Sequence, residues 1–456
     1  MDMVLNHSYG LSPLVKLYYD ESTYKVSDEN PWYNVDSPNP DYFWGYDFNH
    51  EAQATKDFVD RVNSFWLNEY KVDGFRFDFT KGFTNTEGNG WDYDGARISI
   101  LKRMADEIWT VNDKAYIILE HFADNSEEKV LANYDMMVWG NITGNYGEAA
   151  MGYNENGKSD FNWISHKNRG WNEANLVGYM ESHDEERLMF KNLSDGNFAG
   201  LYIIQSLNTS LERIELVATF FITVPGPKMI WQFGELGYDY SIDENGRVGN
   251  KPIRWDYYTE KNRKKLYNVY SALNHLKTSE PAFSTSDFNM EVSGALKRIE
   301  LNHSDMDVRI IGNFDVRDGA IDPNFRQTGD WFDYFSGETL NITNVNELIT
   351  LAPGEYRMYT TKQLETPEII SKIDNSIVIE STTTIYPVPA SDFLYASTAS
   401  EAETTTVFDL NGRIVSHNKA RGINEAIDVS GLNSGIYFLK LEFKNAASEF
   451  LKFIKK

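Results

Sequence analysis

Short apolar runs alternate with longer amphipathic stretches along the first 235 residues of the chain. The apolar runs are VDGFRFDF (72–79), YIILEHF (116–122), MMVWG (136–140), LVGYMESHD (176–184) and KMIWQFGE (228–235). The stretches at 51–70 and 96–112 repeat apolar residues at helical spacing. This alternation predicts an α/β fold with a parallel sheet, and five such units favour a (β/α)8 barrel of the TIM type. An open doubly wound sheet is the alternative, but no Gly-rich phosphate loop follows any of the runs.

The pattern changes near residue 283, where short strand-like runs joined by turns replace the alternation. We therefore predict an all-β domain at residues 283–362. The predicted barrel domain is residues 1–282, and it includes a short loop domain at about 8–50. The stretch ETPEIISKIDNS (365–376) is typical of a linker. A third segment, 376–456, has strands separated by Asn-Gly and Ser-Gly turns, which predicts a small C-terminal β-sandwich.

Polar residues stand at the ends of five predicted barrel strands, where the reactive residues of such barrels lie. These residues are Asp2, Asn6 and His7, then Arg76, Asp78 and Lys81, then Glu120 and His121, then Glu181, His183 and Asp184, and finally Glu235. Alternation along a strand puts Arg76 and Asp78 on one face. The opposite face carries Phe75, Phe77 and Phe79. We therefore expect Arg76 and Asp78 to point into the barrel mouth together.

Three carboxylates at one barrel mouth, Asp78, Glu120 and Asp184, suit glycoside hydrolysis. In retaining enzymes one carboxylate attacks the anomeric carbon and a protonated one donates to the leaving oxygen, with the two about 5–5.5 Å apart. Arg76 would keep Asp78 ionised, because a neighbouring cation lowers the pKa of a carboxyl group. The apolar strand before Glu120 favours a raised pKa, as an acid requires. A structural ion pair is the alternative interpretation of Arg76 and Asp78.

Composition narrows the class of protein further. The chain of 456 residues carries a net charge of −25, which disfavours nucleic acid and anionic membranes as partners. It has no cysteine, and hence neither disulfides nor a thiol metal site. No apolar run is long enough to predict a transmembrane segment. The 27 Tyr, 27 Phe and 11 Trp residues supply flat faces of the kind found in sugar-binding clefts.

The motifs at the strand ends resemble those of the α-amylase family, glycoside hydrolase family 13. Its four signature regions are matched, in order, by DMVLNH (2–7), GFRFDFTKG (74–82), ILEH (118–121) and SHD (182–184). The stretch PGPKMIWQFGE (225–235) is similar to the family's region at the last barrel strand. The resemblance extends over residues 1 to about 360, which includes the β-domain that follows the barrel in this family.

This resemblance implies the roles of seven residues. Asp78 would be the nucleophile, Glu120 the general acid and then base, and Asp184 the stabiliser of the transition state. The residues implied in substrate binding are Arg76, which orients the nucleophile, His7 and His183, which hold the sugar at the cleavage point, and Lys81, which contacts the neighbouring glucose.

Two departures from the family change the expectations. Many members have a histidine after Lys81 that helps to build a calcium site, and Gly82 stands there. The acidic residues of the loop domain have oxygens that suit calcium, namely Asp20, Glu21, Asp28, Asp36 and Asp41. We expect no required cofactor and assign no metal site. The family also has two strands before its first signature region, so we expect a truncated barrel that starts in the third strand, without a signal peptide.

The C-terminal segment resembles the sorting domain of the type IX secretion system. The matching stretches are TTTIYPVPASDFLYA (382–396), VFDLNGRIVS (407–416), LNSGIYFLKLEF (432–443) and FLKFIKK (450–456). A generic adhesive sandwich or a carbohydrate-binding module is the alternative. The resemblance implies a partner in the secretion machinery and a location outside the cell or on its surface.

Three functions are compatible with these residues. The first is a secreted retaining hydrolase of α-1,4 links in starch-like α-glucans. The second, within the same family, is a debranching or branching enzyme that acts at α-1,6 links. The third is a non-catalytic glucan-binding protein, which is disfavoured because all three carboxylates are present. Endo or exo cleavage, oligomeric state and anchoring stay open.

Overall fold

A computed structural model describes residues 1–42, 44–368, 383–410, 412–443 and 448–456. The chain forms two compact units, and each is described by itself. Unit 1 comprises residues 1–142, 162–180 and 224–229, and unit 2 comprises 143–161, 181–223 and 230–456.

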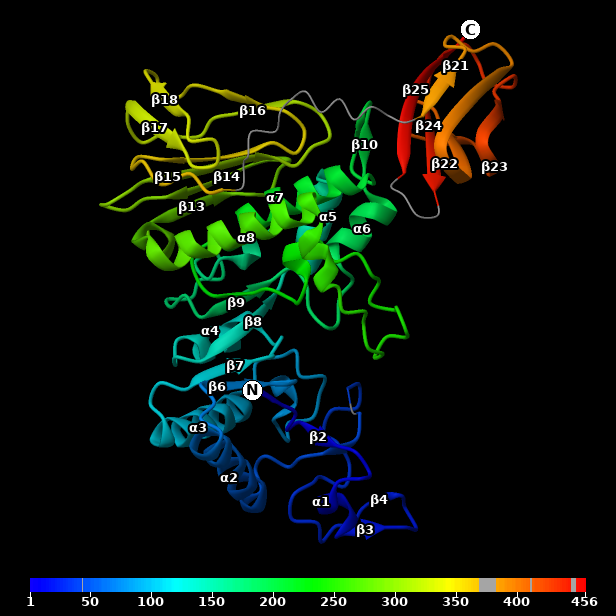
Figure 1. Cartoon of the computed structure of the whole chain (residues 1–456). Coiled ribbons are helices and arrows are strands. Elements are labelled where there is room, and N and C mark those ends of the chain that lie inside the picture. Colours follow the sequence, from blue (N-terminus) through cyan, green and yellow to red (C-terminus); the bar gives the residue numbers. More distant parts are fainter. Residues whose placement is uncertain (43, 369–382, 411, 444–447) are drawn as a thin grey trace. The chain divides into compact units, whose positions relative to one another are not determined.

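A six-stranded parallel sheet forms the centre of unit 1 (Figure 1). In spatial order its strands are β1 (Asp2–Met3), β6 (Gly74–Phe77), β7 (Tyr116–Leu119), β8 (Met137–Asn141), β9 (Leu176–Tyr179) and β12 (Lys228–Met229). Neighbouring strands run parallel throughout. The predicted parallel sheet is therefore confirmed, whereas its closure into an eight-stranded barrel stays a prediction.

Crossover helices connect the first strands of this sheet, as the helical spacing predicts. They are α2 (Gln53–Glu69), α3 (Gly95–Val111) and α4 (Asn125–Ala132). Asp94 begins α3 by accepting hydrogen bonds from the backbone N–H groups of Ala96 and Arg97, a favourable N-cap. The helices and the sheet enclose a core that includes Phe75, Phe77, Leu101, Met104 and Leu119.

The predicted alternation of side chains between the two faces holds to the end of β6, but Phe79, two residues after the strand ends, does not follow it. Phe75 and Phe77 are buried in the core, as expected. Phe79 is not on that face: its backbone has φ 46°, and its ring packs against Tyr42 and Trp44. The strand ends at Phe77, so the two-residue repeat no longer fixes where Phe79 points.

The loop domain predicted at about 8–50 is built from short elements. They are α1 (Pro13–Lys16), β2 (His7–Ser8) paired with β5 (Tyr46–Asp47), and β3 (Tyr19–Asp20) paired with β4 (Lys25–Val26). Its own small core contains Val15, Val26, Tyr33 and Phe48. The pairing of β2 with β5 ties the start of this domain to its end and fixes His7.

Unit 2 begins with helical elements. They are α5 (Thr143–Met151), α6 (Leu188–Asp195), α7 (Leu207–Ile222) and α8 (Lys261–Ser279), with a hairpin of β10 (Phe198–Ala199) and β11 (Tyr202–Ile203). Short 3-10 turns occur at η2 (Glu155–Gly157), η4 (Gly234–Leu236), η5 (Trp255–Thr259) and η6 (Pro281–Ser284), and η3 (Asn162–Ile164) belongs to unit 1. No helix among the described residues is both long and apolar enough to cross a membrane.

The region predicted as all-β forms an antiparallel sheet (Figure 1). Its order is β13 (Phe288–Glu291), β14 (Leu296–Leu301), β15 (Val308–Asn313), β20 (Tyr356–Thr360), β17 (Gly329–Asp333) and β18 (Thr339–Ile342), and β16 (Gly319–Ile321) pairs separately with β19 (Ile349–Leu351). The associated core includes Ile311, Phe325, Trp331 and Leu351.

The C-terminal segment forms a five-stranded antiparallel sheet. Its strands are β21 (Thr384–Tyr386), β22 (Phe393–Phe408), β23 (Ile414–Asp428), β24 (Gly435–Phe443) and β25 (Glu449–Lys455). β22 pairs with β21, β23 and β24, and its register shifts between Ser397 and Ala402. The predicted linker from residue 369 onward, residues 376–382 of the predicted domain, and Asn411 lie outside the described residues.

Candidate active site

The ends of β6 and β7 bring two predicted catalytic carboxylates to neighbouring positions. Phe77 and Leu119, the last residues of the two strands, are partners in the sheet. Asp78 and Glu120 follow them directly. The backbone N–H of Glu120 donates to the carbonyl of Phe77 at 3.0 Å, and that of Asp78 donates to Met3 of β1 at 2.9 Å. Sheet hydrogen bonds therefore fix the main chain of both residues.

Arg76 links three carboxylates at this edge. Its Nη1 donates to Asp2 at 2.7 Å and to Asp78 at 3.0 Å, and its Nη2 donates to Glu120. The guanidinium also lies 4.3 Å from the centre of the Trp139 ring, a cation–π contact. The predicted pairing with Asp78 is confirmed, and the structure adds two partners that the strand pattern did not reveal.

The environment of Glu120 suits a proton donor. Burial raises its pKa to about 7, and the charge of Asp78 and a hydrogen bond to that side chain act in the same direction. Arg76 and the N–H of Phe79, at 3.3 Å, oppose this rise without cancelling it. The side chain of Glu120 is 9% exposed and that of Asp78 is 21% exposed. The two neighbouring carboxyl groups thus have different environments, as an acid and a nucleophile require.

Arg76 is itself held in its charged form. Its burial lowers the pKa of the guanidinium, but the charges of Glu120, Asp2 and Asp78 outweigh burial and raise that pKa. A permanent cation at the centre of three acidic side chains reduces their mutual repulsion. The site therefore keeps its acidic groups close together without leaving them unpaired.

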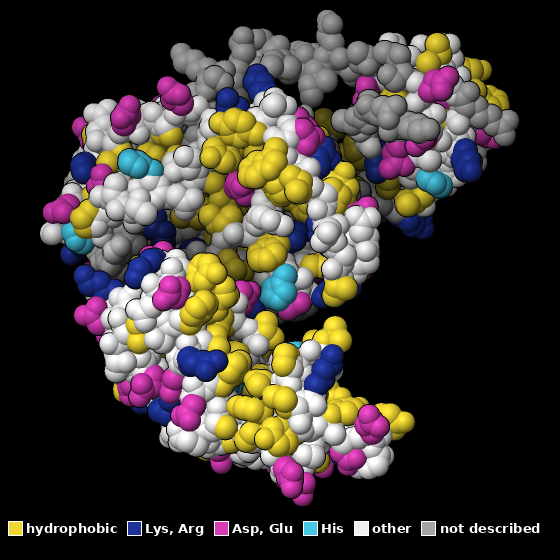
Figure 2. Space-filling view, turned by 60° about the horizontal axis from the view of Figure 1, so that its bottom comes forward, with side chains coloured by type: hydrophobic (Ala, Val, Ile, Leu, Met, Phe, Trp, Pro, Cys, Tyr) yellow, Lys and Arg dark blue, Asp and Glu magenta, His cyan; other side chains and the backbone are white. Residues whose placement is uncertain are grey.

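His7 lies beside exposed aromatic side chains of the loop domain. Its ring is 5.3 Å from that of Tyr9 and 5.9 Å from that of Trp44. Burial lowers the pKa of His7, which favours the neutral imidazole. Figure 2 shows hydrophobic side chains exposed at several places on the visible face, with acidic side chains scattered among them. The flat rings of Tyr9 and Trp44 beside His7 present faces on which a sugar can pack.

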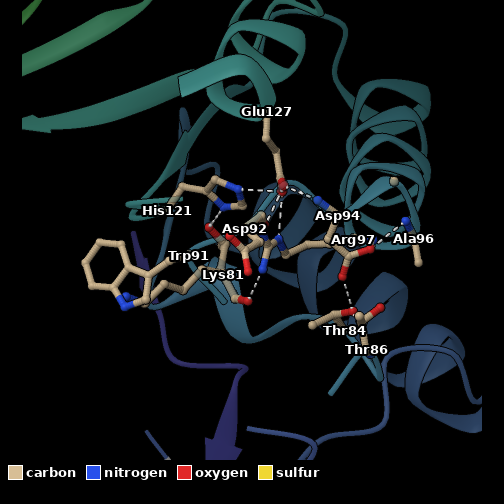
Figure 3. A network of polar contacts seen from close by, with 12 residues as sticks. Lys81, Thr84, Thr86, Trp91, Asp92, Asp94, Ala96, Arg97, His121 and Glu127 are labelled. Atoms are coloured by element: carbon tan, nitrogen blue, oxygen red, sulfur yellow. Dashed lines mark hydrogen bonds and ion pairs between the residues drawn. The ribbon is translucent and has the colours of Figure 1, made fainter. Parts of the chain in front are cut away.

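Lys81 is enclosed by aromatic rings instead of extending into solvent. It lies in the 3-10 turn η1 (Thr80–Gly82), and its Nζ is 3.5 Å from the centre of the Trp91 ring (Figure 3). The rings of Tyr42 and Phe79 lie 4.7 and 5.1 Å from the same atom. Burial lowers the pKa of Lys81 to about 8. Lys81 was predicted as a substrate-binding residue, but its enclosure by aromatic rings was not. The high aromatic content of the chain was the only feature of the sequence that pointed to it.

Asp184 and His183 follow β9 in the chain and belong to unit 2. His183 Nε2 and Asp184 Oδ2 are 3.3 Å apart, and both side chains are exposed. The His183 ring lies 5.8 Å from that of Trp231, and Arg247 donates to the backbone carbonyl of Asp184. Their approach to Asp78 and Glu120 stays a prediction.

Three other polar strand-end residues have different surroundings. His121 is fully buried and points away from the strand end, toward Thr80 and Glu127. Glu181 is buried and accepts a hydrogen bond from the N–H of Leu188, the first residue of α6, at 2.8 Å. Burial raises the pKa of Glu181 and of Glu235. A polar residue at a strand end is thus not by itself evidence of an active-site position.

Two of the acidic residues of the loop domain whose oxygens suit calcium have local partners. Asp20 accepts hydrogen bonds from Ser22 and Thr23, and Asp36 pairs with Lys25. One observation suits a cation: Asn6 Oδ1 is buried and has no hydrogen-bond partner. A single amide oxygen is too small a ligand set for calcium, which takes about six to eight oxygens. A calcium site stays unassigned.

Comparison with solved structures shows that the fold is that of α-amylase-family proteins. An α-amylase of Anoxybacillus is 15% identical with a TM-score of 0.57, covering 79% of this chain and 74% of that chain. Eubacterium rectale Amy13B is 13% identical with a TM-score of 0.58, covering 80% and 79%. A pullulanase from Bacillus acidopullulyticus is 18% identical with a TM-score of 0.56, covering 79% and 46%. A sequence search of curated proteins found no match.

Residues 384–456 match the family described as Secretion system C-terminal sorting domain. This match agrees with the predicted sorting domain and covers the five strands β21 to β25. The domain indicates export to the cell surface or the extracellular space, with the type IX secretion machinery as the implied partner.

Proposed function

We propose that the protein is a secreted retaining glycoside hydrolase that acts on α-glucans, with a preference for α-1,4 links. The observation that carries the proposal is the pair of Asp78 and Glu120 at adjacent strand ends, joined by Arg76. The pKa of about 7 for Glu120 supports its role as the acid. Donation from the single guanidinium of Arg76 to both carboxyl groups supports retention, because inverting enzymes hold the two groups about 6.5–9.5 Å apart to admit a water.

In the proposed reaction Asp78 attacks the anomeric carbon while Glu120 gives its proton to the leaving glycosidic oxygen. The bond between that carbon and oxygen breaks, and the sugar becomes covalently attached to Asp78. Glu120, now ionised, takes a proton from a water that attacks the same carbon and releases Asp78. Arg76 aims Asp78 in both steps. His7 and His183 would hold the sugar, Lys81 would contact the neighbouring unit, and Asp184 would stabilise the transition state.

The substrate class rests on the family's relatives as well as on the site. The structural neighbours include an α-amylase of Geobacillus thermoleovorans in complex with acarbose and AmyP in complex with maltose. A cyclodextrin glucanotransferase and a pullulanase share the same fold. Action at α-1,6 links or glycosyl transfer is therefore the alternative within the family.

Reducing-sugar release from soluble starch tests the proposal, with Asp78→Asn and Glu120→Gln as matched variants of equal size. We expect release by the protein and none by either variant. Release from pullulan but not from starch would instead indicate α-1,6 action. Altered iodine colour without new reducing ends would indicate branching. Starch binding without any release would favour a non-catalytic glucan-binding protein.

A further inference from the structure

A buried polar network lies behind Lys81 in unit 1 (Figure 3). At its centre is Glu127, in the first turn of α4, whose carboxylate accepts four hydrogen bonds. Arg97 donates from Nε at 2.7 Å and from Nη2 at 2.8 Å, His121 donates from Nε2 at 2.8 Å, and the Asp94 N–H donates at 2.7 Å. The side chains of Glu127, Arg97 and His121 are almost completely buried.

One arm of this network runs through Arg97 to the sugar-binding lysine. Arg97 Nη1 donates to the carbonyl of Lys81 at 2.7 Å, and Nη2 donates to the carbonyl of Asp92 at 3.0 Å (Figure 3). Asp92 directly follows Trp91, whose ring covers the Lys81 ammonium at 3.5 Å. One guanidinium therefore holds the main chain on both sides of the contact between Lys81 and Trp91.

A second arm runs through His121 to the proposed acid. A carboxylate can only accept, so His121 donates to Glu127 through Nε2. His121 Nδ1 then accepts from the hydroxyl of Thr80, 2.9 Å away, in the neutral ring that burial favours. The backbone N–H of Thr80 donates to the carbonyl of Glu120 at 2.8 Å. This arm connects the turn after β6 to the residue after β7.

We propose that Glu127 is a positioning residue that fixes Lys81 through Arg97 and Glu120 through His121. The inference rests on the proposed function, because Lys81 and Glu120 are its binding and acid residues. Stability alone is a weak reason for such a network, since well-packed apolar residues often replace buried charged pairs without loss. Its bonds end instead on main-chain atoms of the two residues that the reaction needs in place.

Replacement of both charged partners at once tests the Arg97 arm. The double variant Arg97→Met, Glu127→Gln leaves no buried charge unpaired, and the glutamine oxygen still accepts from His121. We expect the KM for maltoheptaose to rise about tenfold or more, because two charge-assisted hydrogen bonds to the main chain around Lys81 are lost. The matched control is Arg298→Met, Glu300→Gln, a buried pair at 2.8 Å in the antiparallel sheet of unit 2, for which KM stays unchanged.

Thr80→Val tests the His121 arm without a change of charge or shape. It removes the hydroxyl whose one hydrogen lies between two acceptors, His121 Nδ1 at 2.9 Å and the Glu120 carbonyl at 3.1 Å, and so loosens the turn that holds Glu120. Greater hydration of Glu120 would return its pKa toward the ordinary value. We therefore expect the alkaline midpoint of the activity profile to move to lower pH, an effect that loss of stability alone does not produce.

Trp91 provides a readout that does not require activity. The fluorescence of Trp91 is obtained by subtracting the spectrum of a Trp91→Phe version, both in the parent protein and in the Arg97→Met, Glu127→Gln variant. We expect the Trp91 emission to change in the double variant, because its contact with Lys81 is no longer held. Unchanged Trp91 emission together with an unchanged pH midpoint in Thr80→Val would overturn the inference. An inactive parent protein would contradict the proposed function alone, and unchanged Trp91 emission would then by itself overturn the inference for the Arg97 arm.

Discussion

The side chain of Asn6 occupies the space beside Gly82, where many members of the α-amylase family carry a histidine. A Cβ atom on Gly82 would lie 2.0 Å from Asn6 Oδ1 and 2.9 Å from Asn6 Cγ. Asn6 is buried, and its Nδ2 lies 3.3 Å from His7 Nδ1. The glycine is therefore required by close packing against the residue that precedes a proposed substrate-binding histidine.

Gly82→Ala is expected to lower the free energy of unfolding by about 1–3 kcal/mol, because the added methyl group overpacks a buried site. Chemical denaturation measures the change. Gly95→Ala is the matched control, since an added Cβ there meets nothing within 4 Å. The cause is checked by combining Gly82→Ala with Asn6→Ala in a double-mutant cycle. Additive effects of the two substitutions would contradict the proposed steric conflict.

The alkaline limb of activity is expected to have its midpoint near pH 7, set by Glu120. Glu120 must carry a proton to act as the acid, and a raised pKa keeps that proton up to about neutral pH. As the pH rises through this value the acid form is lost, so kcat/KM falls, by about tenfold for each further pH unit. A profile of kcat/KM on maltoheptaose measures the midpoint.

The assignment of this limb to Glu120 is checked in the Asp78→Asn variant by NMR titration of its glutamate carboxyl groups. Removal of the Asp78 charge takes away one cause of the raised pKa, so the Glu120 midpoint should fall. A midpoint that does not move in this variant would mean that the two groups are not coupled.

The strands could be predicted well because buried strands appear in the sequence as short apolar runs. VDGFRFDF and YIILEHF are apolar runs with polar ends, and both became neighbouring strands of one parallel sheet. The pairing of Arg76 with Asp78 also followed, because residues two apart in a strand share a face. These are properties of local spacing, which a single sequence displays.

Contacts between distant segments could not be predicted in the same way. The bond from Arg76 to Asp2 joins residues 74 positions apart, and the Trp91 ring over Lys81 comes from an irregular loop. His121 has the same sequence context as Glu120, yet it points into the interior. Its direction depends on Glu127 in the following helix, which no local pattern identifies as a partner.

Arg76→Lys is expected to lower kcat at least about tenfold to a hundredfold, because charge-assisted bonds of about 1.5–3 kcal/mol are lost. A lysine keeps the charge but cannot hold Asp78 and Glu120 with separate nitrogens in a fixed plane. Steady-state kinetics on maltoheptaose measure the loss. Asp2→Asn is the control, because it alters only the bond from Arg76 to Asp2. It should lower kcat much less, since Asp2 is exposed and water screens its ion pair. Equal losses in both variants would contradict a special role for the Asp78 and Glu120 bonds.

Trp91→Ala is expected to weaken the binding of long glucans and to raise the pKa of Lys81 from about 8 toward its ordinary value, because the ring that keeps water from the ammonium is removed. The pH dependence of Lys81 acylation, followed by mass spectrometry, measures the pKa. Calorimetry with maltoheptaose in the Asp78→Asn background measures binding, for which we expect a loss of about tenfold.

Trp163→Ala is the matched control for this last prediction. Trp163 and Trp91 are both 47% exposed, and the guanidinium of Arg169 lies 5.0 Å from the centre of the Trp163 ring. The control therefore also removes a half-exposed ring from a cation, but not from Lys81. If both variants weaken glucan binding equally, the effect belongs to tryptophan loss in general. If only Trp91→Ala weakens glucan binding, the ring over Lys81 is part of the sugar-binding surface. The same ring then both lowers the pKa of Lys81 and contributes to the binding of long glucans.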